Sequence, residues 1–151
     1  MRPRTVIYNR PQIHLLGGTD ALARLILDRR STLRADIDWR AGRMKEFIDS
    51  HPEQVPRDVA NLCKQIGLAL SGRQARRLFK SSTGIGIRSY SINIRLAIAA
   101  EQLRVTNNPI KVIAAEAGYQ NSRHFARRFK ELFHVKPMEF RKLWRRREFA
   151  V

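Results

Sequence analysis

The feature that most constrains this chain is a repeated segment. GRQARRLFKSST at residues 72–83 is similar to SRHFARRFKELF at residues 122–133, 50 residues later. On a helical wheel with about 100° per residue, each segment has one apolar side and one basic side. The apolar sides carry Ala75, Phe79 and Thr83 in the first segment, and Phe125, Phe129, Leu132 and Phe133 in the second. The repeat therefore predicts two amphipathic helices, each buried along its apolar side.

The basic residues of the two segments match in type and in phase. The matched pairs are Arg73 and Arg123, Arg77 and Arg127, and Lys80 and Lys130. One helix with a basic outer face is usually only solvated surface, but two copies with arginines at the same phase indicate a shared role. Arginine can bond O6 and N7 of guanine bidentately in the major groove of DNA.

A shorter helix is predicted ahead of each basic helix. Apolar residues at i, i+3, i+4 and i+7 occur in both places, namely Val59, Leu62, Cys63 and Ile66 in the first copy and Ile110, Ile113, Ala114 and Ala117 in the second. Gly67 and Gly118 follow directly, and glycine at the C′ position commonly ends a helix. Asn108 and Pro109 have the residue types expected for an N-cap and a first helical residue.

The order of elements in each copy is that of a helix-turn-helix. Ser71 and Asn121 are good N-cap residues and stand where each basic helix should begin. Each copy therefore predicts a helix, a short turn that contains glycine, and a helix with a basic outer face.

Further helices are predicted between the copies and before the first one. Residues 88–104 predict a continuous linking helix with one apolar seam, ended by Asn107, Asn108 and Pro109. The seam consists of Tyr90, Ile94 and Ala97. A leading helix that carries Met44, Phe47 and Ile48 is expected to end near His51 and Pro52. After residue 40 no strand-rich core is expected.

Charge narrows the class of partner. The 151 residues include 30 Lys and Arg against 13 Asp and Glu, a formal net charge of +17. Such a charge favours a polyanion such as nucleic acid, although an acidic membrane surface stays open on charge alone. One cysteine, no signal peptide and no apolar run long enough to span a membrane favour a cytoplasmic protein.

The most specific motif lies at residues 113–142, IAAEAGYQNSRHFARRFKELFHVKPMEFRK. It resembles the pattern I-A-x-x-x-G-[FY], a small polar cap, F-x-R-x-F-K-x-x-F, a turn former and P-x-x-[FY]-R, which is typical of the DNA-binding region of the AraC/XylS family of bacterial transcription regulators. RRLFKSSTGIGIRSY and IRLAIAAEQL are similar to the matching earlier parts of that region. The resemblance covers about residues 43–142.

This resemblance implies an all-α fold in which two helix-turn-helix subdomains, a homeodomain-like pair, are joined by a long linking helix. The implied divisions are an N-terminal extension of unknown role at 1–40, a first subdomain at 41–86, the linking helix at 87–105 and a second subdomain at 106–147. The implied function is sequence-specific binding of double-stranded DNA by two recognition helices in successive major grooves. The family usually activates transcription by recruiting RNA polymerase. The sequence contains no catalytic constellation, so neither an enzyme nor a cofactor is expected.

The family's base-contacting positions fall, where the motifs match, on Arg73, Arg76 and Arg77 in the first copy. In the second copy they fall on Ser122, Arg123 and Arg127. Lys80 and Lys130 lie farther along their helices and are expected to meet phosphates, which position the protein without specifying sequence.

Two departures from the family pattern lead to separate expectations. Ser71 follows Gly67 by four positions, whereas Asn121 follows Gly118 by three, so the first turn is expected to bulge or to shift its recognition helix. His134 stands where the family often has glycine, so its backbone is expected to adopt a positive φ.

The residues before the module predict no sensing domain. VIYNRPQIHLL at 6–16 alternates irregularly, and TDALARLILDRR at 19–30 predicts a capped helix. About 40 residues are too few to enclose a ligand cleft, so no small-molecule effector is expected. The chain resembles either the stand-alone members of the family or a member that lost its sensor, and both alternatives stay open.

Other chemistry is less favoured. Cys63 lies on the buried stripe where Ala114 stands in the second copy, and a reactive thiol needs exposure and a lowered pKa. No histidine or cysteine spacing indicates a metal site.

The main alternative is a basic RNA- or ribosome-associated helical protein, but sequence-specific RNA binding uses exposed aromatic residues. Because Phe79, Phe125 and Phe129 are expected on core faces, duplex DNA is favoured. Residues 141–149, RKLWRRREF, are expected to form a helix end that touches phosphate or solvent rather than membrane.

Overall fold

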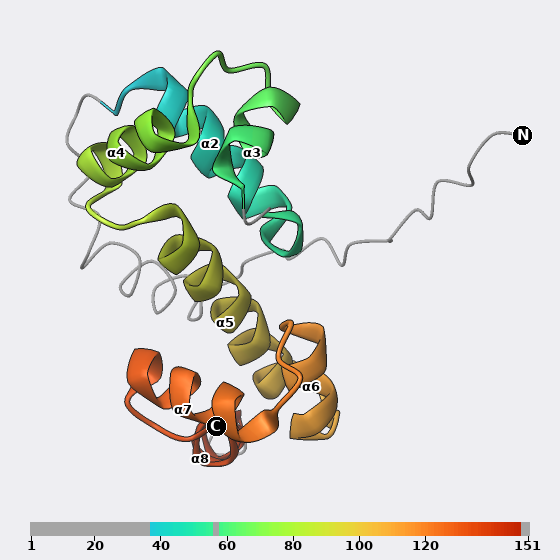
Figure 1. The fold of residues 1–151 in the computed structure, drawn as a ribbon. Coiled ribbons are helices and arrows are strands. Elements are labelled where there is room, and N and C mark those ends of the chain that lie inside the picture. The colour runs from blue at the N-terminus through green and yellow to red at the C-terminus, as the bar shows by residue number, and fades with distance from the viewer. Residues whose placement is uncertain (1–36, 56–57, 149–151) are drawn as a thin grey trace, which may run out of the picture.

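The computed structural model describes residues 37–55 and 58–148, and within these ranges it contains only helices (Figure 1). They are α2 (Trp39–Ser50), the 3-10 helix η1 (Pro52–Gln54), α3 (Val59–Gln65), α4 (Gly72–Thr83), α5 (Ile87–Val105), α6 (Ile110–Glu116), α7 (Ser122–Phe133) and α8 (Pro137–Glu148). The predicted all-α fold is confirmed. The expectations for residues 6–16 and 19–30 lie outside the described residues.

Two separate hydrophobic cores form along the chain. The first gathers buried residues of α2, α3, α4 and the start of α5 around Phe79. The second gathers buried residues from the end of α5, α6, α7 and α8 around Phe125 and Phe129. We call the helices around these cores the first half and the second half, and α5 runs from one to the other (Figure 1).

The linking helix α5 does not have the single apolar seam that was predicted. Its beginning contributes Ile87 and Tyr90 to the first core, and its end contributes other residues to the second core, namely Leu96, Ala99, Ala100 and Leu103. At about 100° per residue these two sets lie on nearly opposite sides of the helix. Ala97, predicted to belong to the seam, is only half-buried and belongs to neither core. A helix that serves two cores must bury different faces at its two ends, which one stripe cannot do.

Each half is built from the same series of helices. The short helices α3 and α6 start 51 residues apart, whereas α4 and α7, like the starts of α5 and α8, are offset by 50. A leading helix precedes each series and buries residues at i, i+3 and i+7, which are Ala41, Met44 and Ile48 in α2 and Leu96, Ala99 and Leu103 in α5. The long helix therefore closes the first half and leads the second.

The ends of α3 and α6 are fixed by glycine, as the sequence predicts. Gly67 has φ +72° and Gly118 has φ +82°. At the end of α3, the N–H groups of Gly67 and Leu68 donate to the carbonyls of Lys64 and Cys63 at 3.2 and 2.8 Å. The same pair of bonds closes α6, and together they form the Schellman arrangement.

The start of α6 differs from the prediction by one residue. The N-cap is Pro109 rather than Asn108, and the helix begins at Ile110. Pro109 keeps an extended ψ of 141°, and its carbonyl accepts the N–H of Ile113 at 3.2 Å. The carbonyl of Asn108 is held instead by Arg141 Nη2 at 2.6 Å. This contact comes from α8, far along the chain, so local residue types could not reveal it.

The position after each recognition helix is left-handed. Gly84 has φ 74° and His134 has φ 64°, which confirms the expectation for His134. In each case the N–H of this residue donates to the carbonyl of a lysine one turn earlier, at 2.8 Å. No helix in the described ranges is both long enough and apolar enough to cross a membrane.

Candidate nucleic-acid interface

The first candidate recognition helix, α4, is held at its start by a reciprocal cap. Ser71 Oγ accepts the backbone N–H of Gln74 at 3.3 Å, and Gln74 Oε1 accepts the N–H of Ser71 at 2.9 Å. Such a capping box satisfies two N–H groups that a helix start would otherwise leave unpaired. Ala75, Phe79 and Thr83 are buried on the inner side, so the orientation of α4 around its own axis is set by the core.

The outer side of α4 presents the predicted cations to solvent. Arg73, Arg76, Arg77 and Lys80 are all exposed. None of the four forms an ion pair within the part of the chain that the structure describes. Free guanidinium groups along one exposed side of a well-anchored helix are suited to contact a polyanion.

The second candidate recognition helix, α7, also has a capped start, a buried inner side and a basic outer side, but its N-cap is an asparagine. Asn121 Oδ1 accepts the N–H groups of Arg123 at 2.8 Å and of His124 at 3.4 Å. Phe125 and Phe129 are buried, and the predicted contact residues on the outer side are exposed, namely Ser122, Arg123, Arg127 and Lys130.

Among the residues that the structure describes, the ion pairs of α7 involve one glutamate, Glu131. Arg128 Nη1 lies 2.6 Å from Glu131 Oε2, whereas Arg127 Nε lies 3.9 Å from Glu131 Oε1. The Arg127 side chain is 70% exposed, and a long, solvated ion pair of this kind is weak. Arg127 therefore remains available to a partner at little free-energy cost.

The longer turn before α4 does not disturb the start of that helix. Leu68 is buried and Leu70 is packed against the first core, while Ala69 between them is exposed. The turn thus bulges at Ala69, and Ser71 still caps α4 directly. The two recognition helices have the same length of 12 residues, and their buried residues stand at matching positions, Ala75 and Phe79 in α4 and Phe125 and Phe129 in α7.

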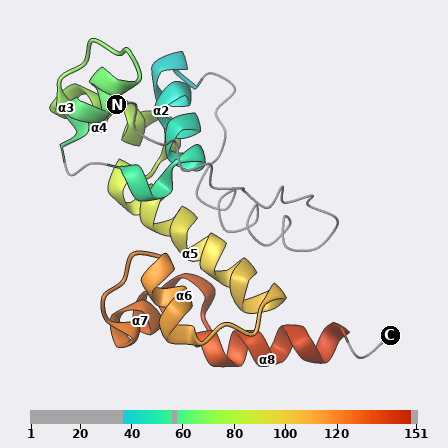
Figure 2. The same cartoon turned by 90° about the vertical axis from the view of Figure 1, so that its right-hand side faces the viewer.

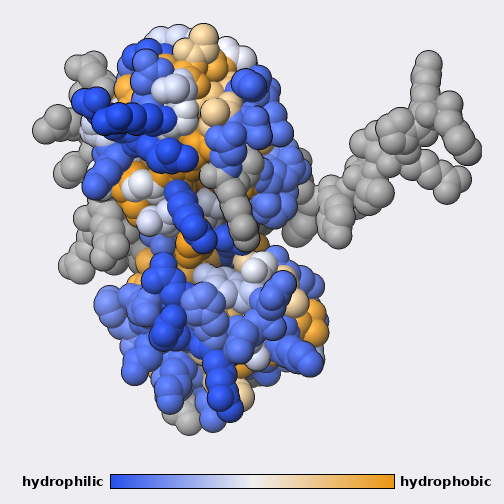
Figure 3. Space-filling model, viewed as in Figure 1, coloured by the Kyte–Doolittle hydropathy of each residue, from blue (hydrophilic) through white to orange (hydrophobic). Residues whose placement is uncertain are grey.

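The two recognition helices lie on the same side of α5. Figure 1 shows α4 and α7 to the left of the linking helix, and in the turned view of Figure 2 both lie in the left part of the molecule, α4 near the upper end of α5 and α7 below α5. In Figure 3 hydrophilic residues cover most of the second half as seen from this direction. An open depression of about 330 Å³ lies at the start of α7, lined by Asn121, Arg123, His124 and Arg127.

Cys63 is not part of this surface. It is fully buried in the first core, and burial raises the pKa of its thiol. A thiol with a raised pKa is a poor nucleophile, so the structural interpretation of Cys63 agrees with its environment. The phenylalanines of both recognition helices that were expected in the core are also fully buried, which leaves Phe79, Phe125 and Phe129 unable to stack on unpaired bases.

Three further arginines, which the sequence analysis did not select, converge near the start of α7. Arg88 and Arg95 come from α5 and Arg128 comes from α7, and all three line a second, larger pocket. The spacing of Arg88 and Arg95, two turns of helix apart, places them on one side of α5, but only the packing of α7 against α5 shows that Arg128 joins them.

The chain is similar to known helix-turn-helix transcription regulators. A helix-turn-helix domain family matches residues 66–143, just over half of the chain. The transcriptional regulator MtrA from Neisseria gonorrhoeae is 30% identical over 128 residues, a match that covers 78% of this chain and 42% of MtrA. The transcriptional activator RhaR from Mannheimia succiniciproducens is 37% identical over 83 residues, which covers 55% of this chain and 29% of RhaR. The chain thus spans less than half of the length of both relatives.

The same similarity appears in three dimensions. A transcriptional regulator from Chromobacterium violaceum, described as having an AraC-type DNA-binding domain, superposes with a TM-score of 0.61 and 25% identity. The superposition covers 68% of this chain and 89% of that structure.

Proposed function

The chain belongs to the AraC/XylS family of DNA-binding transcription regulators, and we propose that it places α4 and α7 in successive major grooves of one DNA site. The observation that carries this proposal is the pairing of two capped helices on one side of α5, each with exposed arginines along its outer side. An α-helix fits the major groove, and arginine is the side chain best suited to read guanine there.

The residues divide by their position along the recognition helices. Base contacts are proposed for Arg73, Arg76 and Arg77 on α4 and for Ser122, Arg123 and Arg127 on α7. Lys80 and Lys130 lie nearer the helix ends, where the groove curves away from a straight helix, and are proposed to contact phosphates. The exposure of all eight side chains supports this assignment.

We further propose that the protein acts in the cytoplasm as an activator that contacts RNA polymerase. RhaR, one of the relatives, is named as a transcriptional activator. The family consists of regulators rather than enzymes, so the chain is not an enzyme. We also propose that no small effector binds the residues before α2 and that control comes through the abundance of the protein.

Selection of binding sites from a random duplex library tests the proposal directly. The expected result is one asymmetric site with two contact blocks about 10 base pairs apart, as one turn of B-DNA requires. A footprint confined to one major groove, or tighter binding to single-stranded RNA than to the best duplex, would contradict it and favour an RNA-associated protein.

A matched pair of variants separates base reading from general attraction. Arg127→Ala should cost about 1–3 kcal/mol on the selected site and relax the preference at one base pair, while affinity for random DNA changes little. Lys130→Ala should weaken binding to all sequences alike and reduce the slope of log K against log salt by about one. Equal losses on selected and random DNA for both variants would show that the arginine side is only an electrostatic surface.

A further inference from the structure

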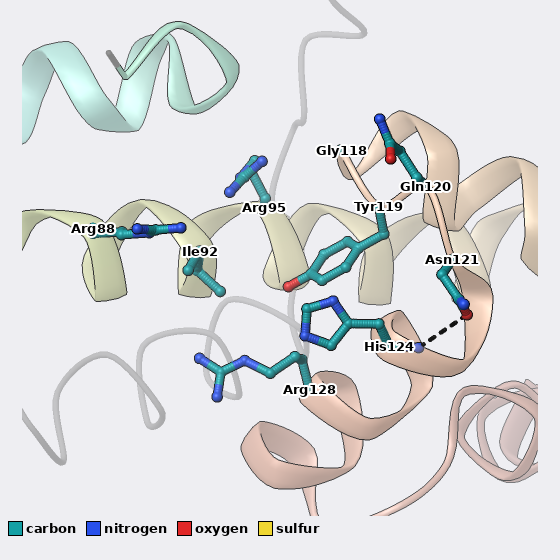
Figure 4. Close-up of a pocket in the computed structure, with 9 residues that line it drawn as sticks. All are labelled: Arg88, Ile92, Arg95, Gly118, Tyr119, Gln120, Asn121, His124 and Arg128. Atoms are coloured by element: carbon teal, nitrogen blue, oxygen red, sulfur yellow. Dashed lines mark hydrogen bonds between the residues drawn. The ribbon is translucent and has the colours of Figure 1, made fainter. Parts of the chain in front are cut away.

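A second pocket lies between the linking helix and the second half of the molecule. It has a volume of about 450 Å³ and is open to solvent. Figure 4 shows Arg88, Ile92 and Arg95 along α5, with the turn between α6 and α7 and the first part of α7 across from them. Arg95 approaches this turn closely, since a Cβ added to Gly118 would lie 2.5 Å from Arg95 Nη1.

The lining of this pocket is strongly cationic. Three arginines and no carboxylate line it, and its other polar members are Tyr119, Gln120, Asn121 and His124. Of the three arginines, Arg128 also pairs with Glu131, which lies outside the lining, at 2.6 Å. Arg88 and Arg95 form no ion pair with any residue that the structure describes, and Arg95 Nε is buried without a hydrogen-bond partner. A buried guanidinium nitrogen without an acceptor costs free energy, so the pocket is suited to an anion that would supply one.

The internal repeat shows that Arg95 is not simply a structural residue of its helix. Its counterpart 50 positions later is Arg145, which donates to the carbonyl of Thr106 at 3.4 Å and to the side chain of Asn107. Arg145 thus ties α8 to the loop before α6, whereas Arg95 makes no such bond and lies in the pocket. Tyr119 and Arg128 correspond to Leu68 and Leu78, which pack on the first core. The pocket is therefore particular to the second half.

The pocket adjoins the proposed DNA-reading surface. Asn121 and His124 line both this pocket and the depression that contains Arg123 and Arg127. Burial raises the pKa of Tyr119. The charges of Arg95 and Arg128 act in the opposite direction and that of Glu131 acts in the same direction, so the phenol lies close to all three charged groups. Its hydroxyl remains protonated at neutral pH and can donate a hydrogen bond to an anion in the pocket.

We infer that Arg88, Arg95 and Arg128 bind one phosphate of the DNA backbone, in the segment between the two major-groove contact blocks. This inference rests on the proposed function, because it needs α4 and α7 to bind one duplex at the same time. Two recognition helices in successive grooves leave an intervening stretch of backbone opposite the linking helix, which is where the pocket lies. The contact would fix the spacing between the two blocks without reading a base.

A scan with neutral phosphates tests the inference. Each phosphate of the selected duplex is replaced in turn by a methylphosphonate, and the dissociation constant is measured for the wild-type chain and for Arg95→Gln. For the wild type we expect a loss of roughly tenfold at one phosphate between the contact blocks, the value of one charged hydrogen bond. In Arg95→Gln that loss should disappear, and the salt slope should fall by about 0.9.

Lys142→Gln is the matched control, because Lys142 is exposed on α8 and lines neither depression. Lys142→Gln should still lose affinity when the sensitive phosphate is replaced by a methylphosphonate, whereas Arg95→Gln should not. If Arg95→Gln loses affinity there as well, the inference is wrong. A lowered melting temperature together with an unchanged loss of affinity would show that Arg95 only stabilises the fold.

A second arm separates the DNA backbone from a free phosphate compound. Pyrophosphate is titrated against the wild-type chain and against Arg95→Gln. Stoichiometric binding that Arg95→Gln abolishes, with no sensitive phosphate in the duplex scan, would overturn the DNA assignment in favour of a small anion. Failure of the proposed function is distinguishable, since the wild type would then select no duplex site at all.

Discussion

The two halves of the molecule are alike in their cores and helix ends and unlike in their polar contacts. Phe79 and Tyr90 meet edge to face at 5.5 Å in the first half, and Phe129 and Phe140 do so at 5.4 Å in the second. By contrast, Ser91 Oγ donates to the carbonyl of Pro52 at 3.0 Å, whereas its counterpart, an arginine, binds the loop before α6.

This difference shows which parts of a repeat can diverge. The aromatic pairs and the left-handed helix ends are set by close packing and by backbone geometry, which allow few substitutions. The polar contacts lie at the margins of the cores, where several residue types can satisfy the same carbonyl. Divergence there leaves the second half with a cationic pocket and the first half with a leucine-lined turn.

The largest expected effect comes from breaking each core separately. Phe79→Ala and Phe129→Ala should each lower the free energy of unfolding by about 3–5 kcal/mol, because each removes a fully buried ring. Native-state hydrogen exchange measures where the loss falls. Since the two cores share no buried residue, Phe79→Ala should expose amides of α3 and α4 more than those of α6 and α7, and Phe129→Ala should do the reverse.

Uniform loss of protection in both halves, for either variant, would contradict that separation. It would mean that α5 transmits the loss of one core to the other and that the halves unfold as one cooperative unit. Ala97→Gly is a suitable control, since Ala97 lies in neither core and should weaken α5 without favouring either half.

Sequence reasoning predicts the helix-turn-helix units well because their signals are local. The caps Ser71 and Asn121 and the C′ residues Gly67 and Gly118 each follow from one or two neighbouring residues, and the positive φ of His134 follows from the family pattern, which often has glycine there. All of them have the predicted role in the structure.

The features that were missed depend on contacts between distant segments. The two seams of α5 arise because two cores lie on opposite sides of one helix. The N-cap of α6 is Pro109 rather than Asn108, and α8 holds the carbonyl of Asn108 through Arg141. The pocket needs α5, the turn before α7 and α7 itself to converge, so no spacing along the chain indicates it. The base contacts of the recognition helices stay predictions.

A smaller effect is expected from exchanging the aromatic residues that differ between the halves. Tyr90 donates its hydroxyl to Asp49 Oδ1 at 2.6 Å, and the buried counterpart of Tyr90 is Phe140. Tyr90→Phe should lower the free energy of unfolding by about 1.5–3 kcal/mol, because it removes a hydrogen bond to a charged acceptor. Chemical denaturation with a two-state fit measures the change.

The reverse exchange sharpens the same comparison. Phe140→Tyr should also destabilise, by about 1–3 kcal/mol, because it buries a hydroxyl in a site built for a hydrocarbon ring. Asp49→Asn serves as the control for Tyr90, since it keeps an acceptor and should cost less than Tyr90→Phe. If Tyr90→Phe proved neutral, the hydrogen bond to Asp49 would contribute nothing to the first half.

The smallest effect concerns the left-handed residue after each recognition helix. Both Gly84 and His134 are exposed, so a side chain at either position has little packing to gain or lose. At φ 64° the backbone of His134 is strained because of its Cβ. His134→Gly should therefore raise the free energy of unfolding by about 0.5 kcal/mol, since the relief of strain is partly offset by a more flexible unfolded chain. Gly84→His should cost about 1 kcal/mol for the same reason. His134→Ala keeps a Cβ at this φ and should not stabilise, so thermal unfolding of the three variants separates backbone strain from loss of the imidazole. A stabilising His134→Ala would mean that the imidazole, rather than the backbone, is what makes the second half differ here.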